Sequence, residues 1–229
     1  MLLYYITDRT QFPGDESARQ SALLKRIGEA ARWGVDYIQL REKDLSARAL
    51  ESLASRAVAE VRRNSSTAKL LINSRIDVAI AAGADGVHLR SRGDLAASDA
   101  RVVFAKSSKH DVVVASSCHT LDEVALAESH GADFTVFAPI FGKDGRAGVG
   151  LEELRRICKR EIAASSRMAV LALGGVTIES AAGCLEAGAA GIAGIRLFQS
   201  GDIGATVTAL RRLGTSPPAT LNRRHPYQS

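Results

Sequence analysis

Short apolar runs alternate with longer amphipathic stretches along almost the whole chain. A short run of consecutive apolar residues is typical of a strand in a parallel sheet that helices cover. Such runs predict eight strands, which begin near residues 2, 35, 69, 85, 111, 133, 169 and 191. The amphipathic stretches predict helices at 18–32, 47–63, 121–130, 151–163 and 178–187, with a short helix within 74–82.

A phrase led by glycine recurs at the start of every second strand. It reads Gly-Val-Asp-Tyr-Ile at 34–38, Gly-Ala-Asp-Gly-Val at 83–87, Gly-Ala-Asp-Phe-Thr at 131–135 and Gly-Ala-Ala-Gly-Ile at 188–192. Glycine just past a helix supplies a left-handed C-cap, and the apolar run that follows is the next strand. The repeat favours a (β/α)8 TIM barrel, with an open doubly wound sheet as the alternative. We predict one barrel over 1–213 and a disordered tail at 214–229, where the composition changes.

Composition and charge narrow the class of protein. The 229 residues are 46% hydrophobic and 24% charged, with a net charge of +5, a pI of about 9.3 and 5% aromatic residues. Without a nucleic-acid motif this basic excess favours anionic small molecules over nucleic acid. Three cysteines without a CxxC pair, no signal peptide and no membrane span predict a soluble cytoplasmic protein. A homo-oligomer is left open.

Candidate chemistry lies where the predicted strands end, because these ends line the active-site mouth of a barrel. Gln39, Arg41 and Lys43 alternate at the end of the second strand and would share one face if the strand continues that far. Two cations and an amide suit a phosphorylated ligand, whereas the alternative is a solvated charge run. Asn73 ends the third strand and adds a neutral hydrogen-bonding group.

The seventh and eighth strands end in glycine-rich phrases. Gly174 and Gly175 let backbone N–H groups approach an anion, and Gly194 leads into a helix whose positive end faces the same place. These loops predict a phosphate site, with tight turns as the alternative. His88 is interpreted as a candidate hydrogen-bonded core histidine, and no His/Asp/Glu grouping has metal-ligand spacing.

Several phrases together resemble the thiamine phosphate synthase superfamily, which also contains thiazole tautomerase. The resemblance runs from about Tyr4 to Phe198. Its phrases are Tyr-Ile-Thr-Asp at 5–8, Ile-Gln-Leu-Arg-Glu-Lys at 38–43, Leu-Ile-Asn at 71–73, Gly-Ala-Asp-Gly-Val-His-Leu at 83–89, Ser-Cys-His-Thr at 117–120 and Leu-Gly-Gly-Val at 173–176.

The resemblance implies a barrel that joins aminopyrimidine diphosphate to thiazole phosphate and releases diphosphate with the help of Mg²⁺. By matching motif it implies that the diphosphate and pyrimidine are bound by Gln39, Arg41, Lys43 and Asn73, with Ser117 at the leaving group. It implies that the thiazole phosphate is bound by Gly175, Gly194, Ile195 and Arg196. The implied catalytic residues are Lys43, Ser117 and Lys143.

The chain departs from the synthase pattern at the metal. An Mg²⁺-binding aspartate follows the asparagine in that pattern, whereas Ser74 stands here, and a hydroxyl is a poor substitute for a carboxylate. The second metal phrase is one residue longer and leaves Asp94 as the candidate metal ligand. The loop after the sixth strand is shorter, which makes Lys143 a loose match, and Arg196 replaces a small hydroxyl residue.

Three functions remain open. The first is a thiamine phosphate synthase-type transferase with an altered metal site. The second is a thiazole tautomerase-like isomerase, although its acid/base histidine is replaced here by Pro139, so that another carrier such as His119 is needed. The third is a non-catalytic binder or sensor of thiamine-related phosphates.

Overall fold

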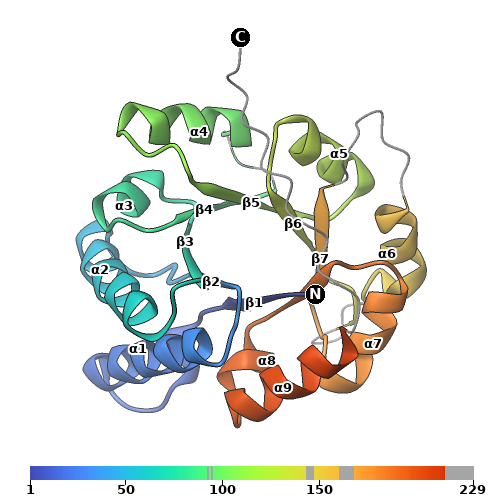
Figure 1. Ribbon diagram of the computed structural model, residues 1–229, viewed down its shortest axis with the longest axis horizontal. Helices are drawn as coiled ribbons and strands as arrows, with labels where there is room; N and C mark the ends of the chain where they lie inside the picture. The colour runs from blue at the N-terminus through green and yellow to red at the C-terminus, as the bar shows by residue number, and fades with distance from the viewer. Residues whose placement is uncertain (92, 94, 143–146, 160–167, 215–229) are drawn as a thin grey trace.

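The computed structural model describes residues 1–91, 93, 95–142, 147–159 and 168–214. Parallel strands form a closed barrel in the order β1 to β8, which Figure 1 shows nearly end-on. The strands are β1 Leu2–Ile6, β2 Tyr37–Leu40, β3 Lys69–Asn73, β4 Gly86–Leu89, β5 Val113–Cys118, β6 Phe134–Phe137, β7 Ala169–Ala172 and β8 Gly191–Gly194. Pairing of β1 with β8 closes the sheet, so the barrel is confirmed and the open sheet is excluded.

A ring of helices covers the outside of the barrel (Figure 1). They are α1 Glu16–Arg32, α2 Ala47–Asn64, α3 Ile76–Ala81, α4 Ala97–Lys106, α5 Leu121–Ser129, α6 Gly150–Cys158, α7 Ile178–Glu186, α8 Arg196–Gln199 and α9 Ile203–Leu213, with a 3-10 turn η1 at Arg9–Gln11. Helix α4 was not singled out from the sequence. Its Val102 and Val103 are 49% and 39% exposed, which blurs the apolar periodicity of the helix.

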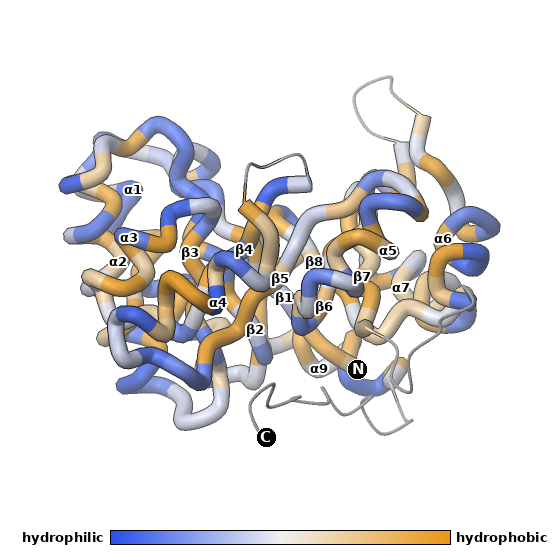
Figure 2. Tube along the Cα trace, turned by 90° about the horizontal axis from the view of Figure 1, so that it is seen from above, coloured by the Kyte–Doolittle hydropathy of each residue, from blue (hydrophilic) through white to orange (hydrophobic). Residues whose placement is uncertain are grey.

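Two apolar layers hold the barrel together. The larger lies between strands and helices, and Figure 2 shows apolar residues concentrated along the strands. The smaller fills the barrel interior around Tyr4, Tyr37 and Phe134. The ring of Tyr4 stands perpendicular to that of Phe134 with 5.3 Å between the centroids, and Tyr37 lies 4.7 Å from Phe134. These aromatic contacts make the interior a packed core rather than a pore.

Two glycines of the repeated phrase are required by close approach of neighbouring strands. A Cβ at Gly86 would lie 1.9 Å from the carbonyl oxygen of Val113, and one at Gly191 would lie 2.1 Å from that of Leu2. Neither site has room for a side chain, so the fourth position of the phrase stays glycine where β4 and β8 enter the barrel.

None of the helices in the described ranges combines the length and apolar composition of a membrane span. The predicted tail from residue 215 onward, and the predicted end of α6 beyond 159, lie outside the described residues.

Candidate active site at the carboxyl ends of the strands

The amide side chains of Gln39 and Asn73 meet at the mouth of the barrel. Gln39 is 2% exposed, and its Nε2 donates a hydrogen bond to Oδ1 of Asn73 over 3.2 Å. They come from the paired strands β2 and β3, in which Leu40 lies opposite Ile72. The two residues predicted from separate motifs therefore form one polar unit. Their remaining amide hydrogens and oxygen lone pairs are suited to a neutral heterocycle or a phosphate oxygen.

The cations Arg41 and Lys43 lie beyond the end of strand β2. The strand stops at Leu40, so the alternation expected to reach Lys43 ends early, and both cations belong to the loop before α2. Arg41 is half-buried and Lys43 is exposed. Neither forms an ion pair within the part of the chain that the structure describes. Their charge is thus available to an anionic ligand.

The acid between these cations, Glu42, is buried and heavily hydrogen-bonded. Its Oε1 accepts from Oγ1 of Thr7 at 2.6 Å, and its Oε2 accepts from the backbone N and Nη1 of Arg9 at 3.0 and 3.2 Å. Burial raises the pKa of the Glu42 carboxyl, and the hydrogen bonds from Thr7 and Arg9 oppose that rise. The oxygen of Thr7 also accepts the backbone N–H of Arg41 at 2.9 Å. Glu42 therefore fixes the loop that carries the cations.

The guanidinium of Arg9 completes this loop network. Its side chain is 4% exposed, and it donates two parallel hydrogen bonds to Asp44 at 2.6 and 2.7 Å and one to Glu16 at 2.8 Å. Sequence reasoning missed Arg9 and Glu42 because each looked like an ordinary surface charge. No local pattern marked Glu42, because β2 ends at Leu40 and the alternation of strand side chains does not extend into the loop.

A second hydrogen-bonded group joins the barrel interior to its mouth, and of its members only Tyr4 was not singled out from the sequence. The hydroxyl of Tyr4 lies 2.9 Å from Nδ1 of His88, and Nε2 of His88 lies 2.8 Å from Oγ of Ser117. Burial, with a smaller contribution from the charge of Arg41, lowers the pKa of His88 to about 3. His88 is thus the hydrogen-bonded core histidine that the sequence suggested, and it also contacts the predicted site residue Ser117.

The loop after β7 contains two consecutive glycines in the left-handed region of φ. Gly174 and Gly175 have φ angles of 94° and 66°, in the region that favours glycine. A Cβ at Gly174 would lie 2.7 Å from Cα of Pro139, and one at Gly175 would lie 2.9 Å from Cβ of Phe141. Phe141 also donates its backbone N–H to the carbonyl of Gly174 at 2.9 Å. The loop after β6 therefore packs directly on the glycine turn.

Strand β8 ends beside this turn and leads into α8. Gly194 is buried, Ile195 is the N-cap residue of α8, and Arg196 is its first residue. A Cβ at Gly194 would lie 2.8 Å from Cβ of Leu197. The Arg196 side chain is exposed and forms no ion pair with any described residue. The backbone at Gly194, which carries no side chain, and the positive charge of Arg196 are suited to a phosphate group.

The expected metal site does not fit the residues that the structure describes. Asp94, the candidate ligand, and Lys143, a candidate catalytic residue, lie outside them. Ser74 has a φ of 60°, and its Oγ is buried without a hydrogen-bond partner. No group of three or more His, Cys, Asp or Glu side chains with metal-binding geometry occurs in the described ranges. Neutral oxygens alone are poor ligands for Mg²⁺.

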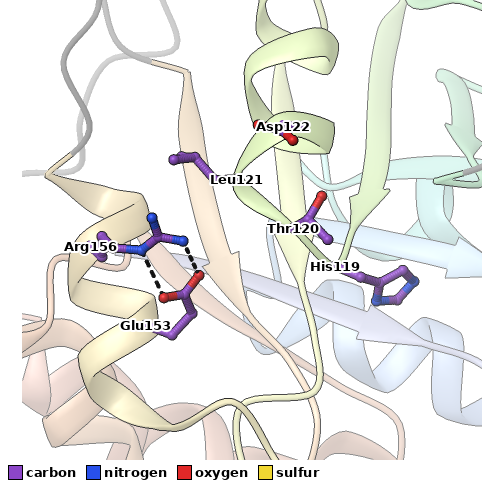
Figure 3. Close-up of a pocket in the computed structure, with 6 residues that line it drawn as sticks. All are labelled: His119, Thr120, Leu121, Asp122, Glu153 and Arg156. Carbon is purple, nitrogen blue, oxygen red and sulfur yellow. Dashed lines mark hydrogen bonds and ion pairs between the residues drawn. The ribbon is translucent and has the colours of Figure 1, made fainter.

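His119 lies on the rim, beside a surface pocket. Its Nδ1 is 2.7 Å from the carbonyl oxygen of Ala138, and its backbone N–H donates to Glu123 at 2.6 Å. Figure 3 shows the imidazole turned away from the ion pair of Glu153 and Arg156 on the opposite side of that pocket. The charges of Glu153 and Arg156 are therefore paired with each other.

Comparison with known proteins gives a consistent result. Residues 3–198 match the family model described as thiamine monophosphate synthase. A putative thiamine-phosphate synthase of Geobacter sulfurreducens is 40% identical over 195 residues, which is 83% of each chain. The thiamine-phosphate synthase of Methanoculleus marisnigri is 36% identical over 214 residues, covering 91% of this chain and 93% of that one. A thiamine phosphate pyrophosphorylase structure from Pyrococcus furiosus matches with a TM-score of 0.74 and 29% identity, covering 93% and 94%.

Proposed function

The chain belongs to the thiamine monophosphate synthase family, and from this premise we propose that it joins aminopyrimidine diphosphate to thiazole phosphate. The products would be thiamine phosphate and diphosphate. The observation that carries the proposal is the pairing of Gln39 with Asn73 at the end of β2 and β3, followed along the chain by Arg41 and Lys43, which form no ion pair with any described residue. An amide pair next to free positive charge suits a heterocycle that bears a diphosphate.

The chemistry requires one bond to break and one to form. The bond between the pyrimidine methylene carbon and the diphosphate oxygen breaks, and its electron pair leaves with the diphosphate. The thiazole nitrogen then supplies a pair to the carbon, and a C–N bond forms without net proton transfer. Arg41 and Lys43 would stabilise the negative charge that develops on the diphosphate oxygens. The Gln39–Asn73 pair would orient the pyrimidine.

The second substrate would bind across the mouth. The glycine turn at Gly174 and Gly175 and the backbone at Gly194 would hold the thiazole phosphate, assisted by the positive charge of Arg196. Ser117 lies on β5, between the two groups in chain order, where its hydroxyl would bind the leaving group. In this assignment the walls of the barrel hold the two reactants in the orientation needed for reaction.

The family resemblance implies Mg²⁺, but the described residues do not supply the carboxylates that such a site needs. In this proposal the residues that neutralise the departing diphosphate are the loop cations, whose position depends on Thr7 and Glu42.

The test is a transferase assay on the purified chain with aminopyrimidine diphosphate and thiazole phosphate. Formation of thiamine phosphate and diphosphate in equal amounts is the expected result, measured with and without Mg²⁺ or Mn²⁺. A chain that makes neither product at any concentration of either metal is not a transferase. An Arg48→Gln variant serves as a control for the loss of one positive charge outside the proposed site, because Arg48 is exposed near the start of α2.

One observation favours a second candidate, an isomerase of the tautomerase type. His119 directs Nδ1 at the carbonyl of Ala138, next to Pro139, where the tautomerase branch has its acid/base histidine. A carbonyl can only accept, so Nδ1 carries a hydrogen and Nε2 is left to exchange a proton with a ligand. This candidate predicts conversion of the unrearranged thiazole carboxylate phosphate without any diphosphate substrate. Loss of that conversion in His119→Asn would support it.

A further inference from the structure

Three side chains form a continuous hydrogen-bonded path from the closed interior of the barrel to its mouth. Tyr4 on β1 is fully buried, His88 on β4 is 2% exposed, and Ser117 on β5 is half-buried. The hydroxyl of Tyr4 lies 2.9 Å from Nδ1 of His88, and Nε2 of His88 lies 2.8 Å from Oγ of Ser117. Each nitrogen of the imidazole therefore has one partner, and the ring separates the buried end of the path from the mouth.

Which group donates in each of these hydrogen bonds follows from the need to give every buried donor an acceptor. His88 Nδ1 is the hydrogen-bond partner of the Tyr4 hydroxyl within the described residues. If Nδ1 carried the hydrogen, the hydroxyl hydrogen of Tyr4 would be buried without an acceptor, which is unfavourable. If Tyr4 donates, both groups are satisfied. Nδ1 is then the acceptor, and Nε2–H must donate to Oγ of Ser117.

Burial keeps the first two members of the path uncharged. It raises the pKa of the Tyr4 hydroxyl well above its usual range, so Tyr4 retains the hydrogen that it donates. It lowers the pKa of His88 to about 3, with the charge of Arg41 adding to this effect, so the imidazole is neutral near pH 7. A neutral imidazole has one donor and one acceptor nitrogen, as the direction above requires.

Ser117 ends the path, and its hydroxyl hydrogen takes part in neither of these two hydrogen bonds. Its oxygen accepts from His88, and the hydrogen has no acceptor among the described residues. Ser117 lies near the carboxyl end of β5, on the side of the barrel that opens at the mouth. A hydroxyl whose oxygen already accepts a hydrogen bond is a better donor to an anion, because hydrogen-bonded groups polarise one another.

We propose that Tyr4 and His88 are positioning residues that hold Ser117 as an obligate hydrogen-bond donor to an anionic oxygen in the barrel mouth. This inference rests on the proposed function, in which that oxygen belongs to the departing diphosphate. Tyr4 acts at a distance, since it touches no ligand and transmits its effect through the tautomer of His88.

The first test reads the tautomer directly and needs no substrate. Protein with 15N-labelled histidine is examined by NMR between pH 5 and 8, and the His88 signals are identified by their absence in His88→Asn. The expected result is a neutral ring with hydrogen on Nε2 throughout this range. Hydrogen on Nδ1, or a ring that titrates in this range, would overturn the proposal whether or not the chain is a transferase.

The second test measures binding of inorganic diphosphate by calorimetry. Tyr4→Phe removes only the hydroxyl and frees the His88 ring to change tautomer, so the Ser117 hydrogen can turn toward Nε2. We expect affinity for diphosphate to fall about 10- to 100-fold, which is the worth of one hydrogen bond to a charged group. The matched control is Tyr5→Phe, which removes a buried hydroxyl bound to Gln199 on the other face of the same strand.

A double-mutant cycle separates positioning from general loosening of the barrel. If Tyr4 acts through Ser117, the Tyr4→Phe change should have almost no further effect on diphosphate affinity in a Ser117→Ala background. Full additivity of the two changes, or equal losses in Tyr4→Phe and Tyr5→Phe, would overturn the proposal. Absence of diphosphate binding in the wild type would instead remove the proposed function, and the tautomer measurement would still decide the direction of the path.

Discussion

The hydroxyl of Thr7 and the carboxylate of Glu42 lie 2.6 Å apart and join the loop after β1 to the loop after β2. Both side chains are buried, and the oxygen of Thr7 also accepts a hydrogen bond from the backbone N–H of Arg41. A chain from Glu42 through Thr7 to Arg41 thus fixes the backbone from which the cation reaches the mouth. Charge at the site is therefore positioned by residues that do not themselves face it.

Replacing Glu42 with glutamine tests this connection. The amide keeps the shape of the side chain but loses the negative charge beside the guanidinium of Arg9 and offers only one acceptor oxygen. We expect the free energy of unfolding to fall by about 1–3 kcal/mol, measured by urea denaturation. The control is Glu51→Gln on the exposed face of α2, which should change stability little. Equal effects of the two substitutions would show that the buried carboxylate is not stabilising.

Removing the charge of Arg41 tests the ligand class. Arg41 is half-buried and free of ion pairs with described residues, so its guanidinium can offer two parallel hydrogen bonds to a phosphate. We expect Arg41→Gln to weaken binding of inorganic diphosphate about 10- to 100-fold by calorimetry, the equivalent of about 1.4–2.7 kcal/mol. The exposed Arg48, changed in the same way, should leave the affinity unaltered. A similar loss in both variants would mean that only net charge matters.

The free energy of unfolding should depend on pH through His88. Burial holds its pKa at about 3 in the folded chain, below the ordinary value of 6.5 for an exposed histidine. The unfolded chain therefore binds the extra proton between these values, and the contribution of neutral His88 is fully present above pH 6.5. As the pH falls from 6.5 toward 3, this group should lower the free energy of unfolding by at most about 1.4 kcal/mol per pH unit.

Urea denaturation between pH 4 and 7 measures this slope. The wild type should lose stability more steeply with falling pH than His88→Gln does. The exposed His110 provides the control, since His110→Gln should leave the slope unchanged. Identical slopes in all three proteins would contradict a buried neutral imidazole.

The order of strands and helices could be predicted because it depends on local patterns. Apolar runs placed β2 and β4 within two residues of their observed starts, and parity placed Gln39 on the face where it meets Asn73. The contacts that orient the site could not be predicted in this way. Tyr4 and His88 are 84 positions apart, and Arg9 and Glu42 are 33 apart. Which side chains meet depends on the relative height of the strands, and of the loops that follow them, in the closed barrel, and no local pattern encodes that height.

The position after Asn73 offers a test of the altered metal site. Ser74 adopts a left-handed φ of 60°, a conformation that aspartate and asparagine tolerate better than most residues, and its Oγ is buried without a partner. Ser74→Asp should therefore fold and place a carboxylate at this position. A buried carboxylate needs a cation, so we expect Mg²⁺ to raise the transferase rate of this variant relative to wild type, about ten-fold or more if the carboxylate joins a metal site.

Ser74→Asn is the matched control, because it has the same shape and the same tolerance of the left-handed conformation without the charge. Mg²⁺ should raise the transferase rate of Ser74→Asp and leave that of Ser74→Asn close to wild type, measured as initial rate against Mg²⁺ concentration. Thermal unfolding with and without Mg²⁺ gives a second readout, because an ion that binds only the folded Asp variant raises its Tm. If the Asp and Asn variants respond alike to Mg²⁺ in both measurements, the residue at position 74 does not account for the departure from the family's metal site.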